Sequence, residues 1–559
     1  MKLTPILKII LLLLLCVTVA VVAFTAFFTM RDKVKLNIEP DAKLALKSFS
    51  GTSVGQPMDK TQVNSDYFRI PAMITLDNGW IVAAADSRWR TSSDSPNNLD
   101  TIVSISKDGG KNWEWETVNY YSDYPSDVNS NKSSSFIDPA LLKDGEGNVW
   151  MAVDSLGANC GLMHGNNLGR KSTGFDEKGR IIIAKAKPGS LSPKSASAYT
   201  YYLDLNSNGI DTQIRSDEPI VNAWNETVTV YPICREQDDF ETDYYADAFF
   251  NTYEKSEDGK IVPIYCAQQS STFFTQDNLY YCTSIWRTYP TFFIMLRKGT
   301  VTSEGIKWGD PIYPNIKSNP KEAFTAVCPG RGFVTTLAGG NERIIFPMYD
   351  NDNGTEYTSI IYSDDGGKTW TRGSDADALN GTGKSSESQI ISLPDGNLRM
   401  YSRNTADYIS YADSTDNGET WDEYTFDTAL PYCGNCMVSF INIDGTIVDN
   451  DGNRYTNLVM ASYPMNLKNK DRYDGTVRIG YINENEAGMP IHWFTAAGEP
   501  RYSGQFRYSC LTQMLDENGE PTNKFAILYE PNDEAGRISV LFDTFSIQDI
   551  IGNRYTFEK

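Results

Sequence analysis

The chain has 559 residues, of which 40% are hydrophobic and 22% charged, a balance typical of globular proteins and not of disordered ones. This length predicts one large repetitive domain or two domains, because a single simple core stops growing well below it. The net charge of −22 argues against nucleic acid as a partner, since phosphate binding needs a basic surface. With only two histidines, a histidine-based metal site or a Ser-His-Asp triad is close to excluded.

The N-terminal segment, residues 1–33, stands apart in composition. Lys2 and Lys8 precede an uncharged stretch of 22 residues that runs from Ile9 to Met30. A stretch of this length can cross a bilayer as a helix, whereas the apolar part of a signal peptide usually has about 7–15 residues. We therefore expect a transmembrane signal anchor, with a cleaved signal peptide as the alternative. Either one places residues 34–559 outside the cytoplasm, at the cell surface or secreted.

The remainder of the chain is typical of an all-β protein. The whole chain contains 42 Gly and 25 Pro, nearly all of them in this remainder, and 12% of all residues are aromatic. Short β-branched and aromatic runs alternate with these turn-forming residues, which predicts many strands.

A short repeat with the pattern S-x-D-x-G-x-x-W occurs three times. Its copies are 106–113, 363–370 and 414–421, and each follows a strand-like run. The pattern suits a hairpin turn, because the Asp and Ser side chains can accept hydrogen bonds from backbone N–H groups and the Gly allows a positive φ. We expect the Trp to pack back onto the sheet and assign the repeat no catalytic role.

The spacing of the repeats predicts blades and an insertion. The second and third copies begin 51 residues apart, close to the length of one four-stranded propeller blade. Nearly 200 residues separate the first copy from a degraded one at 303–308, which is too many for two blades. We expect the surplus to form an insertion at about 155–285, either a β-rich subdomain or long loops.

The cysteines give a weak signal. Outside the cytosol some could pair, and Cys234, Cys266 and Cys282 are close enough in sequence to suggest it. Connectivity cannot be deduced from sequence. Cys433-Gly-Asn-Cys436 has the spacing of half a zinc or redox site, but packed thiols or a structural disulfide are favoured because nothing nearby completes such a site.

The segment Tyr67-Phe-Arg69-Ile-Pro-Ala72 precedes the first repeat. Together with the repeats, this Arg-Ile-Pro segment resembles the microbial sialidase (neuraminidase) family from about Asp66 to Glu530. The resemblance implies a six-bladed β-propeller as the catalytic domain, here 34–559 with the insertion inside it. It also implies an exo-acting glycosidase that removes terminal sialic acid.

Three arginines of the family clasp the substrate carboxylate. The resemblance assigns these substrate-binding positions to Arg69, to Arg403 in Leu398-Arg-Met-Tyr-Ser-Arg403 and to Arg478 in Asp474-Gly-Thr-Val-Arg478. Guanidinium groups suit this role because each can make parallel hydrogen bonds to a carboxylate and stays charged at any working pH. At contact distance they can hold an anion despite the negative net charge, since remote charges are screened.

The family's acid/base Asp follows a strand that ends in Asp-x-Arg. Here Asp86-Ser-Arg88 is followed by Asp94, which takes that catalytic position, and Arg88 resembles a residue that holds ring substituents of the sugar. A partly exposed Asp suits a group that must donate a proton and later activate water. Asp138, in Ser135-Phe-Ile-Asp138-Pro139, matches another carboxylate that lines the family's pocket.

The nucleophile segment is Tyr508-Ser-Cys510-Leu-Thr512, and its partner is Glu387 in Ser385-Ser-Glu387. A tyrosine suits this substrate because the anomeric carbon bears a carboxylate that would repel an anionic nucleophile, whereas a phenol deprotonated by Glu387 would not be repelled. Glu387 and Arg403 lie sixteen residues apart, which predicts one face of their strands if the intervening hairpin is regular. No metal or cofactor is implied.

The favoured function is retaining hydrolysis of terminal sialic acid from glycoproteins, glycolipids or oligosaccharides. An intramolecular trans-sialidase, in which a glycerol hydroxyl of the sugar attacks and an anhydro-sugar leaves, is the near alternative. A sialic-acid-binding propeller without catalysis would not need Asp94, Glu387 and Tyr508 together. A purely structural propeller would not need the three arginines.

Overall fold

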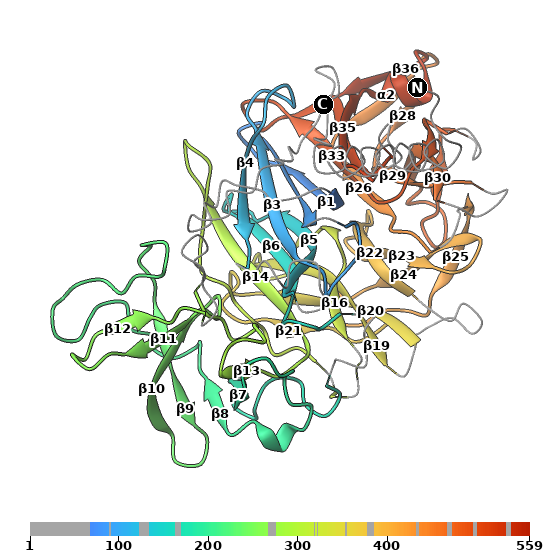
Figure 1. The fold of residues 1–559 in the computed structure, drawn as a ribbon. Coiled ribbons are helices and arrows are strands. Elements are labelled where there is room, and N and C mark those ends of the chain that lie inside the picture. The colour runs from blue at the N-terminus through green and yellow to red at the C-terminus, as the bar shows by residue number, and fades with distance from the viewer. Residues whose placement is uncertain are drawn as a thin grey trace, which may run out of the picture.

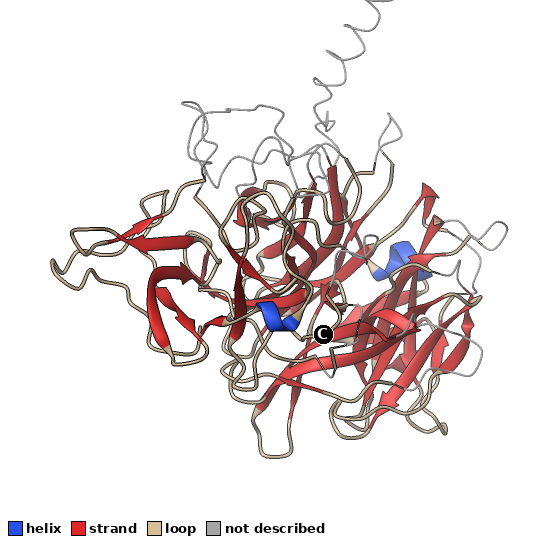
Figure 2. Cartoon of the chain, turned by 60° about the horizontal axis from the view of Figure 1, so that its bottom comes forward, coloured by secondary structure: helices blue, strands red, loops and turns tan. Residues whose placement is uncertain are grey.

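The computed structural model describes residues 67–559 except for 89–90, 122–132, 162–168, 267–275, 318, 321, 323, 353–354, 377–384, 432–434, 467–471, 496–499 and 533–537. The expected membrane or signal segment at 1–33 lies outside the described residues. Within them, no helix is long and apolar enough to cross a membrane. The secondary structure is almost entirely β (Figure 2), which confirms the expectation of an all-β chain.

The first half of the chain forms two four-stranded antiparallel groups in one continuous sheet. The first group is β1 (Tyr67–Thr75), β2 (Ile81–Arg88), β3 (Leu99–Ser106) and β4 (Glu114–Asn119). The second is β5 (Ser135–Lys143), β6 (Val149–Leu156), β14 (Phe292–Val301) and β15 (Ile306–Trp308). A short parallel contact between β3 and β5 joins them, and β17 (Gly330–Arg331) adds to β5.

The second half continues with separate antiparallel sheets. The third sheet has β16 (Thr325–Val327), β18 (Phe333–Thr336), β19 (Glu342–Asp352), β20 (Thr355–Ser363) and β21 (Thr371–Arg372). The fourth has β22 (Ser385–Ser392), β23 (Leu398–Asn404), β24 (Tyr408–Ser414) and β25 (Thr425–Pro431). The fifth has β26 (Ser439–Ile443), β29 (Leu458–Pro464), β30 (Tyr473–Ile482), β31 (Ile491–Trp493) and β32 (Tyr502–Gln505).

The last sheet returns the chain to its beginning. It has β33 (Ser509–Leu515), β34 (Pro521–Tyr529) and β35 (Leu541–Phe545). Strand β33 contacts β1, and β1 also contacts β5, so the first and last sheets are neighbours. A small sheet of β27 (Thr446–Asp449), β28 (Arg454–Tyr455) and β36 (Tyr555–Glu558) and the short helix α2 (Ile547–Ile551) flank this end (Figure 1).

The core lies between successive sheets. One cluster joins the first two groups through Ala72, Val82, Leu141 and Met151. Another joins the last sheet to the first through Met73, Ala83, Leu528 and Phe542. Because apolar faces are buried on both sides of each sheet, inner strands such as β2 and β6 are buried at every residue.

The three repeat turns have the hydrogen bonds that the pattern predicts. In the first, Asp108 Oδ1 accepts from the backbone N–H groups of Lys111 and Asn112 at 3.0 and 2.9 Å, and Ser106 Oγ accepts from Gly110 N at 2.8 Å. The matching glycines all have positive φ, 90° at Gly110, 87° at Gly367 and 90° at Gly418. Each turn also packs onto the preceding sheet of the circuit, as Trp113 does against Phe542 of β35.

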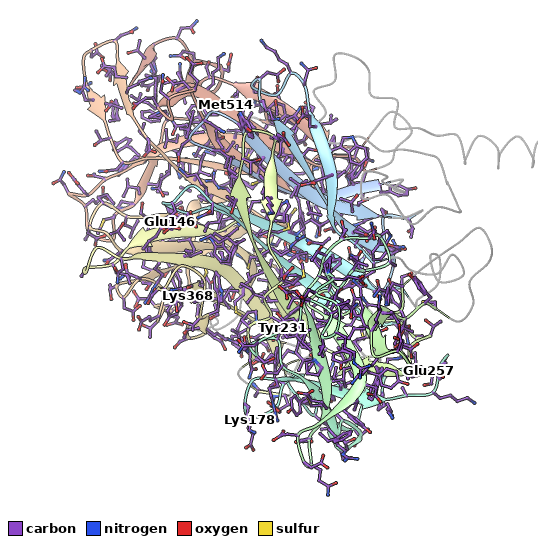
Figure 3. All side chains as sticks on the ribbon, turned by 90° about the vertical axis from the view of Figure 1, so that its left-hand side faces the viewer. Glu146, Lys178, Tyr231, Glu257, Lys368 and Met514 are labelled. Atoms are coloured by element: carbon purple, nitrogen blue, oxygen red, sulfur yellow. The ribbon has the colours of Figure 1, made fainter. Side chains whose placement is uncertain are left out.

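Between β6 and β14 the chain forms a separate seven-stranded sheet in the order β12-β11-β10-β9-β8-β7-β13. Its elements are β7 (Ile181–Lys185), η2 (Ala196–Ala198), β8 (Tyr201–Leu203), β9 (Val230–Arg235), β10 (Phe240–Asp247), β11 (Thr252–Lys255), β12 (Ile261–Pro263) and β13 (Trp286–Thr288). The sheet projects to one side (Figures 1 and 3), where Lys178, Tyr231 and Glu257 lie apart from Met514.

The inserted sheet shares a core with the second group of strands. Tyr121, Phe136 and Phe293 pack with Leu203 and Ile233 of the insertion. Ser155 of β6 is hydrogen-bonded to both Tyr121 and Tyr280. The suggested pairing of Cys234, Cys266 and Cys282 is not found: none of these three buried cysteines forms a disulfide in the described structure.

Candidate active site

The centre of the site is the hydroxyl of Tyr508, which immediately precedes β33. It donates a hydrogen bond to Glu387 Oε1 of β22 at 2.5 Å and accepts one from Arg403 Nη1 of β23 at 2.8 Å. Arg403 Nη1 also lies 2.7 Å from Glu387 Oε1. Residues from two sheets thus meet at one phenol, as the sequence predicts for these three.

The environment keeps the proton on the phenol of Tyr508. Burial raises the pKa of Tyr508 well above its ordinary value, and Glu387 raises it further, while Arg403 opposes them. A neutral phenol hydrogen-bonded to a carboxylate is arranged to lose its proton only as a new bond to the oxygen forms.

Glu387 lies at a β-bulge. Strands β22 and β23 pair Ser386 with Arg403 but Ser388 with Ser402, so the register shifts at Glu387. The five pairs on the hairpin side, from Ser388 with Ser402 to Ser392 with Leu398, would continue with Glu387 directly opposite Arg403, on the same face of the sheet. The bulge only brings Ser386 opposite Arg403 as well, so the shared face is the one that the even spacing predicts.

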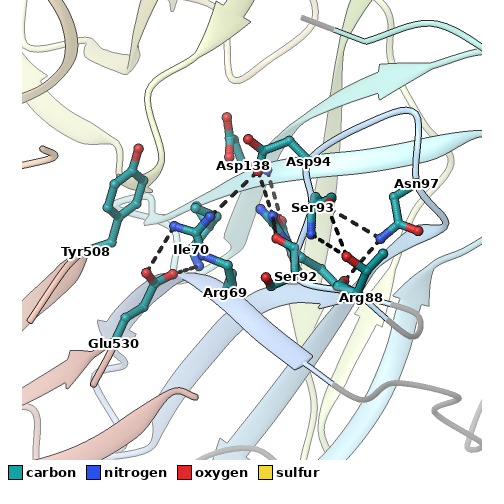
Figure 4. Close-up of polar contacts among 12 residues, drawn as sticks. Arg69, Ile70, Arg88, Ser92, Ser93, Asp94, Asn97, Asp138, Tyr508 and Glu530 are labelled. Carbon is teal, nitrogen blue, oxygen red and sulfur yellow. Dashed lines mark hydrogen bonds and ion pairs between the residues drawn. The ribbon is translucent and has the colours of Figure 1, made fainter. Parts of the chain in front are cut away.

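Arg69 is held in place from the last sheet. Its Nη2 donates to Glu530 Oε2 at 3.1 Å, and Glu530 Oε1 accepts from the backbone N–H of Ile70 at 2.6 Å (Figure 4). The guanidinium lies 5.6 Å from the centre of the Tyr508 ring. Ile70 has a φ of 60° at a bulge in β1, a strained conformation for a β-branched residue that this hydrogen bond helps to hold.

Asp94 lies beside Arg69, in the connection between β2 and β3. Its Oδ1 is 3.7 Å from Arg69 Nη1 and 2.6 Å from Arg88 Nη1, and half of its side chain is exposed. The structure therefore brings Asp94, Arg69 and Tyr508 into one region, as expected.

The structure contradicts the expectation that Arg88 touches the sugar. Its side chain has no exposed surface, and its guanidinium donates to Asp86 Oδ2 and to the Ser92 carbonyl as well as to Asp94. The physical reason is that Arg88 neutralises the fully buried Asp86, whose pKa is raised to about 7 because burial outweighs that neutralisation. Arg88 therefore positions Asp94 through the hydrogen bond from its Nη1 to Asp94 Oδ1.

Asp138 lies on β5 next to this group. Its backbone N–H donates to Asp86 Oδ1 at 3.0 Å, and its φ of 64° marks another bulge in an inner strand. Burial raises the pKa of the Asp138 carboxyl well above its ordinary value, and the nearby Asp86 and Asp154 raise it further. Burial and the neighbouring carboxylates thus favour the protonated form of Asp138.

The assignment of Arg478 to the carboxylate clasp is wrong. Its guanidinium donates to the carbonyls of Ala429 and Thr495 and lies 4.7 Å from the centre of the Trp493 ring. The third guanidinium at the site is instead Arg472, just before β30 and 5.5 Å from the centre of the Tyr508 ring. The two arginines are six residues apart. Arg472 directly precedes β30, which begins at Tyr473, whereas Arg478 lies within this strand.

Sequence reasoning also missed Asn435, which connects two arginines of the site. Its Oδ1 accepts from Arg403 Nε and Nη2 at 3.1 and 2.7 Å, and its backbone carbonyl accepts from Arg472 Nη2 at 2.6 Å. Asn435 lies between Cys433 and Cys436, and the spacing of these cysteines gives no indication of a role for the residue between them. Its φ of 53° suits an asparagine.

Comparisons with known proteins give an independent indication of the class of protein. Residues 206–461 match a family model described as a BNR repeat-like domain. The chain is 26% identical to an anhydrosialidase of Macrobdella decora over 87% of this chain and 62% of the relative, and 27% identical to sialidase B of Streptococcus pneumoniae over 62% of this chain and 46% of the relative. The chain is therefore similar in sequence to known sialidases. It thus spans less than two thirds of the length of these two curated relatives.

The fold of the chain is also found in solved structures. The intramolecular trans-sialidase from Ruminococcus gnavus superposes with a TM-score of 0.68 at 25% identity, covering 89% of this chain and 99% of that one. Within the described part of the chain, no group of three or more His, Cys, Asp or Glu side chains is placed to hold a metal ion.

Proposed function

We propose that this protein is a retaining glycosidase that releases terminal sialic acid from glycoproteins, glycolipids or oligosaccharides. The observation that carries the proposal is the position of the Tyr508 hydroxyl, 2.5 Å from a Glu387 oxygen and 2.8 Å from an Arg403 nitrogen. Arg69 and Arg472 flank the same ring. Three guanidinium groups around one phenol suit a sugar whose reacting carbon carries a carboxylate.

In the proposed mechanism, Arg69, Arg403 and Arg472 bind the sugar carboxylate. Glu387 takes the phenol proton as the Tyr508 oxygen attacks the anomeric carbon, and Asp94 gives a proton to the departing oxygen of the aglycone. The sugar is then bonded to Tyr508. Asp94, now ionised, removes a proton from water, and the water oxygen replaces the Tyr508 oxygen at the anomeric carbon. Glu387 returns its proton to the departing Tyr508 oxygen, and the configuration of the sugar is retained.

An intramolecular trans-sialidase is the second candidate, and the comparisons favour it specifically. One curated relative is named an anhydrosialidase, and the structure from Ruminococcus gnavus is that of an intramolecular trans-sialidase. In that reaction a hydroxyl of the bound sugar's own glycerol chain replaces water in the second step. The first step, and the role of every residue above, is unchanged.

The test is a fluorogenic sialoside assay on residues 34–559, followed by mass spectrometry of the released sugar. Release of the fluorophore is expected from the wild-type protein and not from Asp94→Ala. A product one water lighter than sialic acid identifies the intramolecular reaction, and a product of full mass identifies hydrolysis. A folded wild-type protein that binds sialic acid but releases nothing would support the non-catalytic binding function instead.

We also infer that the six antiparallel groups are the blades of a six-bladed β-propeller, because β1 contacts both β5 and β33 and apolar clusters fill the spaces between successive groups. We propose further that residues 1–33 place the domain outside the cytoplasm, on a membrane or secreted. Fractionation of cells with and without residues 1–33, with an activity assay on intact cells, tests this location.

A further inference from the structure

Asp94 shares one guanidinium group with the proposed carboxylate site. Arg69 has one nitrogen, Nη2, on Glu530 at 3.1 Å, and its Nη1 lies 3.7 Å from Asp94 Oδ1. That second distance is too long for a hydrogen bond, so Nη1 is available to an incoming carboxylate. A carboxylate hydrogen-bonded to Nη1 would then stand within a few ångströms of Asp94.

The charges around Asp94 favour its ionised form in the structure. Burial opposes ionisation, but Arg88, Arg69 and Arg472 together outweigh it and hold the pKa of Asp94 below its ordinary value. The other titratable groups that face this region are Asp86 on β2 and Asp138 on β5, and burial raises the pKa of both. An ionised Asp94 cannot donate the proton that the proposed first step requires.

We propose that the sugar carboxylate and a proton on Asp94 bind cooperatively: the carboxylate that binds Arg69 displaces Asp94 as its counter-ion, and Asp94 takes up the proton that it later gives to the leaving oxygen. The inference rests on the proposed function and deepens it. The site takes up one ligand anion and one proton from solvent, so its net charge does not change when the ligand binds.

With the sugar bound, three carboxylates surround the Arg69 guanidinium, those of Glu530, Asp94 and the sugar, and binding one proton relieves their repulsion. The proton goes to Asp94, because the sugar carboxyl is the stronger acid: it is attached to a carbon that also bears the electron-withdrawing ring oxygen. Arg88 keeps Asp94 in position throughout, since its Nη1 remains 2.6 Å away and its other nitrogens are bound to Asp86. Asp94 is thus protonated only when a sialoside is bound.

The experiment is isothermal titration calorimetry at pH 5 with 2-deoxy-2,3-didehydro-N-acetylneuraminic acid, an analogue that has the carboxylate and no leaving group. Titrations in two buffers with different ionisation enthalpies give the number of protons taken up. We expect about half to one proton per ligand for the wild type and close to none for Asp94→Asn. The wild-type affinity should fall by up to about tenfold per pH unit as pH rises from 5, and the affinity of Asp94→Asn should stay nearly constant.

The methyl ester of the same analogue is a control that needs no variant. It carries no charge to displace Asp94, so the wild type should bind it without proton uptake. Equal uptake for acid and ester, equal uptake by Asp94→Asn, or no uptake by the wild type would each overturn the inference. A wild-type protein that binds neither compound would overturn the proposed function itself, so the two failures are distinguishable.

Discussion

At the scale of single residues, the Tyr508 hydroxyl is the atom whose surroundings are most restrictive. The hydroxyl is hydrogen-bonded to Glu387 and Arg403, and the guanidinium groups of Arg69 and Arg472 lie beside the ring. These groups interact with the phenol oxygen through their charge, and none of them depends on that oxygen for its packing. Removing that oxygen should therefore change chemistry far more than binding or folding.

Tyr508→Phe should lower the turnover of a fluorogenic sialoside by about a thousandfold or more, because the nucleophile is lost while the arginines remain. Affinity for the didehydro analogue, measured by calorimetry, should change only a few-fold. Tyr253→Phe is a matched control, since its hydroxyl is also buried and donates to a carboxylate, Asp247, in the inserted sheet at 2.8 Å. Near-normal turnover in Tyr508→Phe would remove Tyr508 from the mechanism.

Arg472 and Arg478 offer a paired test at the same scale. Arg472→Ala should weaken binding of the analogue by about 2–5 kcal/mol with little change in thermal midpoint, because the side chain faces the site and makes one hydrogen bond to the Asn435 carbonyl. Arg478→Ala should instead destabilise the fold by about 2–4 kcal/mol, since it leaves the carbonyls of Ala429 and Thr495 unpaired. The reverse pattern in calorimetry and thermal melts would restore Arg478 to the clasp.

At the scale of elements, bulges decide where the site residues point. Arg69, Asp138 and Glu387 all lie at register shifts in the first strand of their group or sheet. A one-residue shift moves a side chain to the other face of a sheet, so alternation along the sequence alone cannot place Arg69 and Asp138. Glu387 is different, because the register of its hairpin carries it opposite Arg403, as the even spacing predicts.

The same scale explains the wrong assignment of Arg478 and the two residues that were missed. Arg472 and Arg478 both precede or lie within β30, and nothing in local composition says which one the strand buries. Glu530 and Asn435 had no recognised motif of their own, and their roles depend on partners far away in sequence, as between Glu530 and Arg69. The repeat turns were predicted correctly because their hydrogen bonds are local, within four residues.

The repeat turns also fasten neighbouring sheets, which a glycine pair can test. A Cβ on Gly367 would lie 2.0 Å from the Trp150 ring of β6, whereas a Cβ on Gly366 would meet nothing within 4 Å. Gly367→Ala should destabilise the protein by about 3 kcal/mol or more, because the clash adds to the strain of a positive φ. Gly366→Ala carries the strain alone and should cost about 1 kcal/mol. Equal losses in denaturant titrations would mean that the turn does not bear on Trp150.

At the scale of the whole molecule, buried carboxyls set the pH dependence of stability. Burial raises the pKa of Asp100 to about 7, although the Tyr121 N–H bonded to it opposes the shift. Asp154, also fully buried, is shifted in the same direction. A raised folded-state pKa means that the folded protein binds more protons than the unfolded chain, so this stability is complete below the ordinary value near pH 4 and is lost as pH rises through 7.

The thermal midpoint should therefore fall between pH 5 and pH 8. The exposed repeat-turn carboxylates act in the opposite sense, but only at lower pH: hydrogen bonds from Thr369 lower the pKa of Asp365 to about 2, so its contribution is lost below pH 4. Asp100→Asn should show a shallower fall than the wild type in differential scanning calorimetry. A midpoint that rises from pH 5 to pH 8 would contradict the argument.

Glu530 accepts hydrogen bonds from Arg69 and from the backbone of Ile70, which lie 461 and 460 residues before it in the chain. A chain still leaving the ribosome can have folded its first five sheets and yet leave Arg69 unsupported, because Glu530 follows the middle strand of the sixth. On the proposed function, the enzyme therefore becomes active only after the sixth sheet has been synthesised and folded. Proteolysis that releases this sheet would abolish the activity.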